Sequence, residues 1–217
     1  MLTQFSIWAL LDSLAEGAKW TVALSLIAFV CGGIAGLVVL FARVSGKRAL
    51  TVLSKAYIEV FQGTPLLMQL FIIFFGLSML GVDVSAWLAA AVGLTLFTSA
   101  YLAEIWRGCV EAVPKGQWEA SASLALNYRE QMRHVVLPQA LRIAIAPTVG
   151  FLVQVVKSTA VASIIGFTEL TKTGSMLANA TFQPFLIFGL VAIAYFLLCY
   201  PLSLYARHLE TKYHAAR

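Results

Sequence analysis

A continuous uncharged run from Trp20 to Phe41 is the feature that most constrains how this chain folds. The run is 22 residues long and almost wholly apolar. An α-helix rises 1.5 Å per residue, so about 20 such residues are needed to cross the hydrocarbon core of a bilayer. A second run of this kind extends from Phe185 to Tyr205. The sequence therefore predicts membrane-spanning helices near both ends.

The composition of the whole chain agrees with a lipid environment. Of its 217 residues, 60% are apolar and 12% are charged, whereas an ordinary globular domain carries about 25% charged residues. These values exclude a soluble enzyme, a disordered tail and a nucleic-acid-binding domain with a solvated surface. The net charge of +5 comes from basic residues confined to a few short connections, so we expect no nucleic-acid partner.

Three more segments are apolar enough to cross the bilayer, although each carries polar residues. Ala56–Leu80 contains a Gly63-Thr64-Pro65 break, and Leu141–Phe167 contains Lys157. We therefore predict an all-α integral membrane protein with five transmembrane helices in one domain that covers residues 1–217. The predicted spans are about 18–42, 56–80, 84–107, 139–167 and 184–206.

The distribution of Lys and Arg predicts the orientation of these spans. Twelve of the fifteen basic residues fall in the connections after the first and third spans and in the C-terminal tail. Cytoplasmic connections carry an excess of Lys and Arg. We therefore expect the N-terminus outside and the C-terminus in the cytoplasm, which an odd number of spans permits.

Residues 2–17 precede the first span and have an amphipathic pattern. Leu10 and Leu14 lie on one side of a helix, and Asp12 and Glu16 on the other. This pattern is typical of a helix that lies in the membrane interface. The alternative is a frayed terminus.

The longest non-spanning segment is the predicted cytoplasmic connection 108–138. It reads as two short helices, at residues 117–126 and 129–136, bounded by Pro114 and Pro138. Small residues in such a compact projection allow the backbone of another protein to come close, which suits insertion into a groove of a partner. The alternative is a helical hairpin on the membrane surface that only links two spans.

The spacing of this connection resembles the EAA loop of ABC-importer permeases. The family pattern is Glu-Ala-Ala, three residues, Gly, nine residues, Ile, any residue and Leu-Pro, and the spacing here matches it throughout. Ser121 replaces Ala, Ala125 replaces Gly and Val135 replaces Ile. The change at Ala125 bears most on how sharply the two short helices turn. The residues at the seven positions of the pattern are Glu119, Ala120, Ser121, Ala125, Val135, Leu137 and Pro138.

Further segments are similar to the polar amino-acid subfamily of these permeases. Gln62 stands where that subfamily commonly has Arg, and Ser158 stands where it often has Asp. Both differences remove a charge from the expected transport region. The similar segments are Phe61–Leu70, Tyr101–Gly108, Pro114–Ala120 and Lys157–Thr159.

The resemblance implies a permease subunit with a type I importer fold in a bacterial cytoplasmic (inner) membrane, importing polar amino acids. It implies a second permease subunit, identical or different, two ATP-binding subunits and an external solute-binding protein. The chain has no GxxxxGK[ST] segment that would cradle phosphates. ATP and magnesium are therefore expected in the partner ATPase, with no cofactor or metal in this chain, which is not itself an enzyme. The alternatives are an importer of another small solute and a membrane scaffold that transports nothing.

Seven residues of the connection are predicted to couple the permease to the ATPase. This role is implied by the resemblance. The alternative for Glu119 is a solvated residue at the start of a helix, where its negative charge interacts favourably with the helix dipole. The candidate coupling residues are Glu119, Ala120, Ser121, Ala125, Tyr128, Leu137 and Pro138.

A second set of polar residues is predicted to line the substrate pathway. Lys157 is costly inside a span, so it faces a cavity or a partner; we expect it to contact the substrate carboxylate, to pair with Glu169, or to extend to the outer headgroups. Glu104 and Arg107 are predicted to form a structural ion pair. The candidate pathway residues are Gln62, Thr64, Tyr101, Gln154, Lys157, Ser158 and Thr159.

Overall fold

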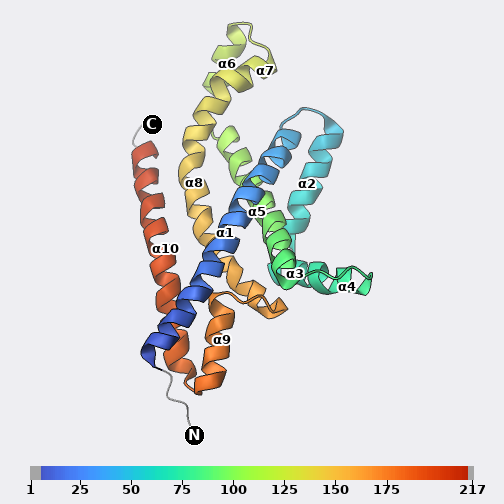
Figure 1. Cartoon of the computed structure of the whole chain (residues 1–217). Helices are drawn as coiled ribbons and strands as arrows, with labels where there is room; N and C mark the ends of the chain where they lie inside the picture. Colours follow the sequence, from blue (N-terminus) through green and yellow to red (C-terminus); the bar gives the residue numbers. More distant parts are fainter. Residues whose placement is uncertain (1–5, 215–217) are drawn as a thin grey trace.

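The computed structural model describes residues 6–214, and all regular structure in that part of the chain is helical (Figure 1). Short helical turns η1, η2 and η3 interrupt or extend the α-helices. The elements are α1 Ile7–Arg43, α2 Arg48–Gly63, α3 Leu66–Phe71, η1 Ile72–Gly76, α4 Leu77–Met79, α5 Ala86–Glu111, α6 Lys115–Ser123, α7 Tyr128–Gln131, η2 Met132–Val136, α8 Leu137–Ser158, η3 Thr159–Ile165, α9 Leu170–Thr181 and α10 Pro184–His214.

Four helical segments in the described part are long and apolar enough to cross a membrane. A fifth span results if the bent pair formed by α2 and Leu66–Met79 is counted as one. This agrees with the predicted all-helical membrane architecture. The four segments are Ile7–Arg43, Ala86–Glu111, Tyr128–Ile165 and Pro184–Tyr213.

The predicted second span, 56–80, is broken at the Gly63-Thr64-Pro65 segment, as the sequence indicated, and its first helix begins earlier than expected. Helix α2 already begins at Arg48, and its axis makes an angle of 103° with the segment Leu66–Met79. Thr64 lies before Pro65 in an extended conformation, as the ring of a following proline requires. The helix therefore breaks there, and α3 and α4 run sideways from the bundle (Figure 1).

The segment predicted as an interfacial helix, residues 2–17, is helical from Ile7 onward, but among the residues that the structure describes it is not a separate helix. From Ile7 onward this segment is part of α1, which continues without a break through the first span; residues 2–5 lie outside the described part. Leu10 and Leu14 are buried against side chains of α9 and α10. Protein packing covers Leu10 and Leu14, whereas Ile7 and Leu11 of the same segment remain exposed.

Helix α9 is an element that the sequence pattern did not indicate, because its residues alternate polar and small side chains. It follows a left-handed Gly166 (φ 90°) and packs between α1 and α10 at the end of the bundle opposite α6 and α7 (Figure 1). Its position explains why Leu10 and Leu14 near the start of α1 are buried.

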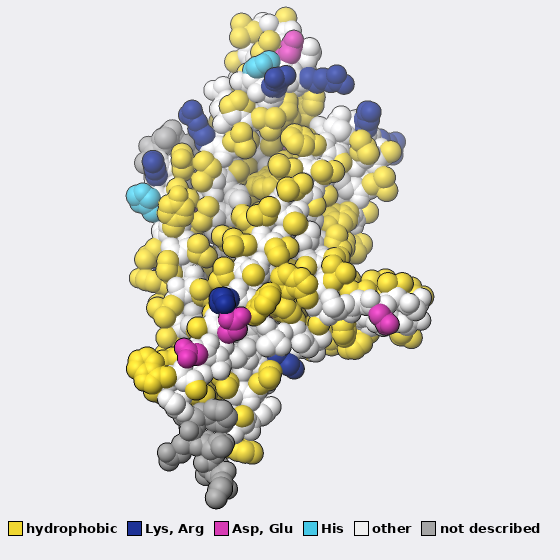
Figure 2. Space-filling model, in the orientation of Figure 1, with side chains coloured by type: hydrophobic (Ala, Val, Ile, Leu, Met, Phe, Trp, Pro, Cys, Tyr) yellow, Lys and Arg dark blue, Asp and Glu magenta, His cyan; other side chains and the backbone are white. Residues whose placement is uncertain are grey.

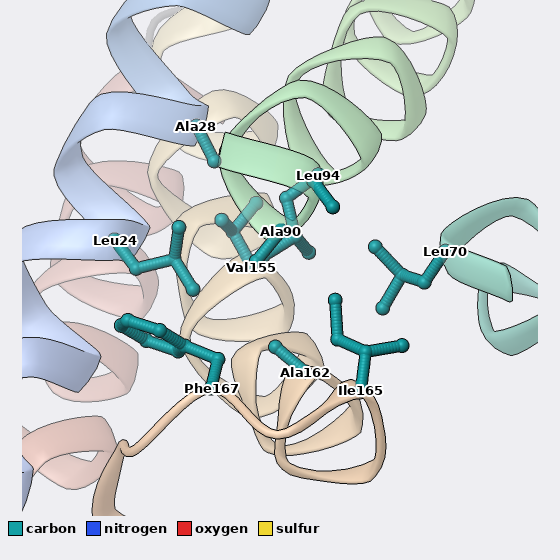
Figure 3. Packing of buried hydrophobic residues seen from close by; sticks show 10 residues of the cluster. Leu24, Ala28, Leu70, Ala90, Leu94, Val155, Ala162, Ile165 and Phe167 are labelled. Carbon is teal, nitrogen blue, oxygen red and sulfur yellow. The ribbon is translucent and has the colours of Figure 1, made fainter. Parts of the chain in front are cut away.

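The core lies where α1, α5, α8 and η3 meet (Figure 3). Leu70 of α3 also reaches this cluster, so the sideways arm is anchored to the bundle by its first turn. The largest interface joins α1 and α5. Gly32 and Gly36 face α5, where a Cβ on Gly32 would lie only 2.7 Å from the side chain of Thr98. Small residues thus permit close approach of the two helices, as the GxxxG spacing predicts.

The surface separates into an apolar body and a basic end (Figure 2). Lys and Arg side chains gather around α6 and α7 and around the neighbouring ends of α2 and α10, whereas hydrophobic side chains cover most of the rest. Many large apolar side chains are exposed on this body. Exposed apolar surface of this extent requires lipid or a protein partner to cover it.

Candidate coupling loop and transport region

The connection 108–138 forms a projection in which α6 and α7 fold back on each other beyond the end of α5 (Figure 1). Helix α7 starts with a capping box: the side chain of Asn127 accepts hydrogen bonds from the backbone of Arg129 and Glu130, at 3.1 Å each. The Glu130 carboxylate accepts one in return from the Asn127 backbone, at 2.9 Å. This cap fixes where the second helix begins.

The projection shares a small core with the long helices that carry it. Val110 and Val113 at the end of α5 pack against Met132, Val136 and Ala140. Continuous helix from α7 through η2 into α8 completes the connection. The projection is therefore attached to α5 and α8 as one packed body.

Most candidate coupling residues are accessible to a partner on this projection. Ser121 is an exception, since it is buried and its hydroxyl donates to the carbonyl of Trp118 at 2.8 Å. Leu137 is half-buried beside the small core. The exposed candidates are Glu119, Ala120, Ala125, Tyr128 and Pro138.

Ala125 turns the chain between α6 and α7 in a left-handed conformation, with φ 59°. An L-residue with a Cβ is disfavoured there by about 1–2 kcal/mol. The family pattern has Gly at this position, which adopts such angles freely. The sharp turn is thus kept in this chain although Ala replaces Gly.

The four polar residues of α8 and η3 are not brought together on one face. Gln154 and Lys157 are exposed, whereas Ser158 and Thr159 are buried. The Thr159 hydroxyl donates to the carbonyl of Val156 at 2.8 Å. Of these four residues, Gln154 and Lys157 therefore offer polar atoms to the outside of this chain.

Lys157 does not pair with Glu169, which was one of its three expected roles. No ion pair in residues 6–214 includes Lys157. The acceptors of Glu169 are taken by other donors. The ion pair between Glu104 and Arg107 is confirmed, with Nη2 and Oε1 2.6 Å apart, and Arg107 also pairs with Glu111.

The three weaker pathway candidates lie near the junction of α2 and α5. Tyr101 stacks on Phe151 of α8, with ring centroids 5.5 Å apart and an interplanar angle of 13°. The Gln62 amide donates to the carbonyl of Ala100 at 3.4 Å. Thr64 uses its hydroxyl within α2, donating to the carbonyl of Val60 at 2.7 Å. Gln62 and Tyr101 are therefore neighbours across the two helices.

Sequence reasoning missed Gln69, which joins the two parts of the bent span. Its amide nitrogen donates to the carbonyls of Phe61 and Thr64 at 2.9 and 3.1 Å and to the Thr64 hydroxyl at 2.9 Å. The last carbonyls of a helix lack partners within the helix, so this buried side chain stabilises the open end of α2. A lone amide in an apolar run after a proline break was the available signal.

Sequence reasoning also missed the structural role of Glu169, which is fully buried. It caps α9, since its carboxylate accepts hydrogen bonds from the backbone of Thr171 and Lys172 at 2.9 and 2.8 Å. The Tyr195 hydroxyl of α10 donates to it at 2.7 Å. A buried carboxyl group with this many donors is the meeting point of α9 and α10.

Comparison with known proteins identifies the family. Residues 20–214 match the family model described as the binding-protein-dependent transport system inner membrane component. The chain is 35% identical over 198 residues to the probable amino-acid ABC transporter permease YckA of Bacillus subtilis (strain 168), covering 91% of this chain and 88% of that protein. It is 34% identical over 209 residues to the glutamine transport system permease GlnP of Escherichia coli (strain K12), covering 95% of each.

Solved structures agree with this assignment. A chain from the crystal structure of an amino acid ABC transporter with histidines superposes with a TM-score of 0.90 at 29% identity, covering 97% of this chain and 100% of that one. A chain of the methionine ABC transporter MetNI in an inward-facing conformation has the same fold, with a TM-score of 0.64 at 21% identity over 94% of this chain and 97% of that one.

These matches extend over nearly the whole chain and include the projection, so the expected resemblance is confirmed. A permease that depends on a binding protein works with that protein and with an ATPase, which carries out the hydrolysis in a separate subunit. The chain belongs to the family of binding-protein-dependent transport system inner membrane components, and is a multi-pass permease subunit of a bacterial ABC importer.

Proposed function

We propose that this permease carries polar amino acids across the inner membrane into the cytoplasm. The observation that carries the proposal is the similarity to GlnP over 95% of both chains, because GlnP is named for glutamine transport. The superposition on an amino-acid transporter at a TM-score of 0.90 supports the same substrate class. Gln62 and Ser158 lack the charges common in the amino-acid subfamily, which favours a substrate with an uncharged side chain.

The transporter would contain two permease subunits, two ATP-binding subunits that hold ATP and magnesium, and an external binding protein. One chain with four or five spans is too small to enclose and gate a solute route. The exposed Lys157 and Gln154 support a second permease, because a cation on an apolar helix is tolerated beside a partner or a cavity but is costly in lipid.

The basic end with α6 and α7 would face the cytoplasm, and the end with α9 would face outward. Lys and Arg cluster at the first of these ends (Figure 2), as the positive-inside rule requires of a cytoplasmic face. The first and last helices agree with this orientation, because α1 starts beside α9 and α10 finishes at the opposite, basic end of the bundle (Figure 1).

In this orientation the projection would dock on the ATPase through Glu119, Ala120, Tyr128 and their exposed neighbours. Closure of the ATP-binding subunits would displace the projection, and α5 and α8 would follow as rigid bodies. The small core shared by Val110, Met132 and Ala140 supports this mechanism, because it makes the projection too stiff to absorb the movement.

The test is reconstitution of the permease with its ATPase and binding protein in lipid vesicles, with a panel of amino acids. Polar amino acids should stimulate ATP hydrolysis and enter the vesicles. Glu119→Lys should reduce stimulation while the binding protein still binds, and Glu210→Lys, an exposed carboxylate on α10, is the matched control. Stimulation by another solute class alone would refute the substrate, and full stimulation in Glu119→Lys would refute the coupling site.

A further inference from the structure

The projection makes a contact with α1 that a simple link between α5 and α8 does not require. The Tyr128 hydroxyl donates a hydrogen bond of 3.0 Å to the carbonyl of Val44. Val44 is the C-cap residue that follows Arg43, the last residue of α1. Because the last carbonyls of a helix have no partner within it, this oxygen is free to accept a bond from outside.

Tyr128 is held firmly enough to act as part of the projection. Its backbone begins α7 directly after the Asn127 capping box. Its ring stacks on Trp118 of α6, with centroids 6.2 Å apart and an interplanar angle of 20°. Trp118 in turn packs on the small core of the projection. The hydroxyl therefore moves when the projection moves.

The other half of α1 is fastened to α9 by a second polar contact. The Thr21 hydroxyl accepts a hydrogen bond from the backbone of Leu170 at 3.2 Å, and donates to the Glu169 carboxylate at 3.4 Å. Thr21 and Glu169 are both fully buried. Movement of α1 is thus passed to the start of α9, which a short connection, residues 166–169, joins to η3 and its pathway candidate Thr159.

Helix α1 joins these two contacts without a break. It has 37 residues, a length of about 55 Å, and no proline. Gly32 and Gly36 pack directly on the side chains and backbone of α5, as at Gly36 and the Ser99 carbonyl. A continuous helix packed in this way shifts as one body rather than bending.

We propose that α1 is a second coupling route, in which Tyr128 passes displacement of the projection to α1 and α1 passes it to α9 through Thr21 and Glu169. Tyr128 is a positioning residue in this route, since it acts through Val44 and does not touch the substrate. The proposal rests on the proposed docking of the projection on the ATPase.

The test is Tyr128→Phe in the reconstituted complex, because this change removes the hydroxyl and keeps the stacked ring. We expect the amount of assembled complex to stay the same, and uptake per ATP hydrolysed to fall by a factor of about two to ten, which is the range for one hydrogen bond. The matched control is Tyr205→Phe, an exposed tyrosine of α10, which should leave the ratio unchanged. An unchanged ratio of uptake to ATP hydrolysis in Tyr128→Phe would overturn the route, even if both rates fell together.

A double-mutant cycle with Thr21→Val tests whether the two contacts act in series. If α1 connects them, the combined variant should lose no more coupling than the worse single variant; if the losses multiply, the contacts are independent and the route is refuted. Thr21→Ser keeps a hydroxyl and should restore coupling, which controls for misfolding. If Glu119→Lys leaves stimulated ATP hydrolysis unchanged, the docking itself is refuted. If Glu119→Lys reduces it but Tyr128→Phe keeps the wild-type uptake per ATP, only the route through α1 is refuted.

Discussion

Tyr195 donates a hydrogen bond of 2.7 Å to Glu169 in the interior of the helix bundle. The same hydroxyl lies 2.9 Å from that of Thr171. Burial of a carboxyl group is costly unless its oxygens are satisfied. Here the donors to Glu169 are the backbone N–H groups of Thr171 and Lys172 and the hydroxyls of Tyr195 and Thr21. The arrangement joins α1, α9 and α10 at one point.

The first prediction concerns this bond. Tyr195→Phe should lower the free energy of unfolding by about 1–3 kcal/mol, because it leaves a buried acceptor short of a donor. Thermal unfolding of the purified protein in detergent measures the effect. Tyr200→Phe is the control on the same helix, since Tyr200 is exposed and stacks on Phe196. Equal stability of the two variants would contradict the role assigned to Tyr195.

The second prediction concerns the contact between α1 and α5. A methyl group on Gly32 would lie 2.7 Å from the side chain of Thr98, so Gly32→Ala should force the helices apart. Overpacking of this kind costs about 1–3 kcal/mol. The neighbouring Gly33 provides a matched control, because a methyl group there would meet its nearest atom only at 3.9 Å.

Unfolding midpoints of the two glycine variants decide this prediction. Gly33→Ala should match the wild type or exceed it, since Ala is favoured over Gly in a helix by about 1 kcal/mol. Gly32→Ala should unfold at a lower temperature. The reverse order would mean that α1 and α5 do not approach as closely as the structure shows.

The long helices were predictable because a membrane span is defined by one property, about 20 apolar residues in sequence. The bend of 103° after α2 was not, although Gly63-Thr64-Pro65 marked a break. The angle depends on packing between distant residues: Leu70 fits over Gly93 of α5. A break is a local property of the chain, whereas its angle is a tertiary one.

The candidate sites show the same limit. The resemblance of its spacing to the EAA loop predicted the coupling role of segment 108–138, whereas the residues alone left a linking hairpin as an equal alternative. Spacing did not indicate that Ser121 is buried, since both sides of a short helix carry small residues there. On α8, Gln154 and Ser158 are one turn apart and share a face by periodicity, but only Ser158 is buried in the folded chain.

The third prediction concerns the turn at Ala125. Ala125→Gly should remove a conformational penalty of about 1–2 kcal/mol, while greater freedom of the unfolded chain offsets about 0.5–1 kcal/mol of the gain. The net result is a projection stabilised by up to about 1.5 kcal/mol. Amide hydrogen exchange of α6 and α7 measures it, with α10 as the internal reference. Faster exchange in α6 and α7 of the variant would contradict the left-handed turn.

The last prediction concerns Lys157, which is exposed on α8 and has no ion-pair partner in the described part of the chain. If its ammonium group contacts the substrate carboxylate, Lys157→Met should raise the KM for uptake about 10-fold to 100-fold, because a hydrogen bond to a charged group contributes about 1.5–3 kcal/mol. The stability of the protein should not fall, since the change removes an unpaired cation from an apolar helix. Lys172→Met on α9 is the control and should keep the wild-type KM. Normal uptake by Lys157→Met would exclude the contact, and a loss of stability with an unchanged KM would assign Lys157 to the permease interface instead.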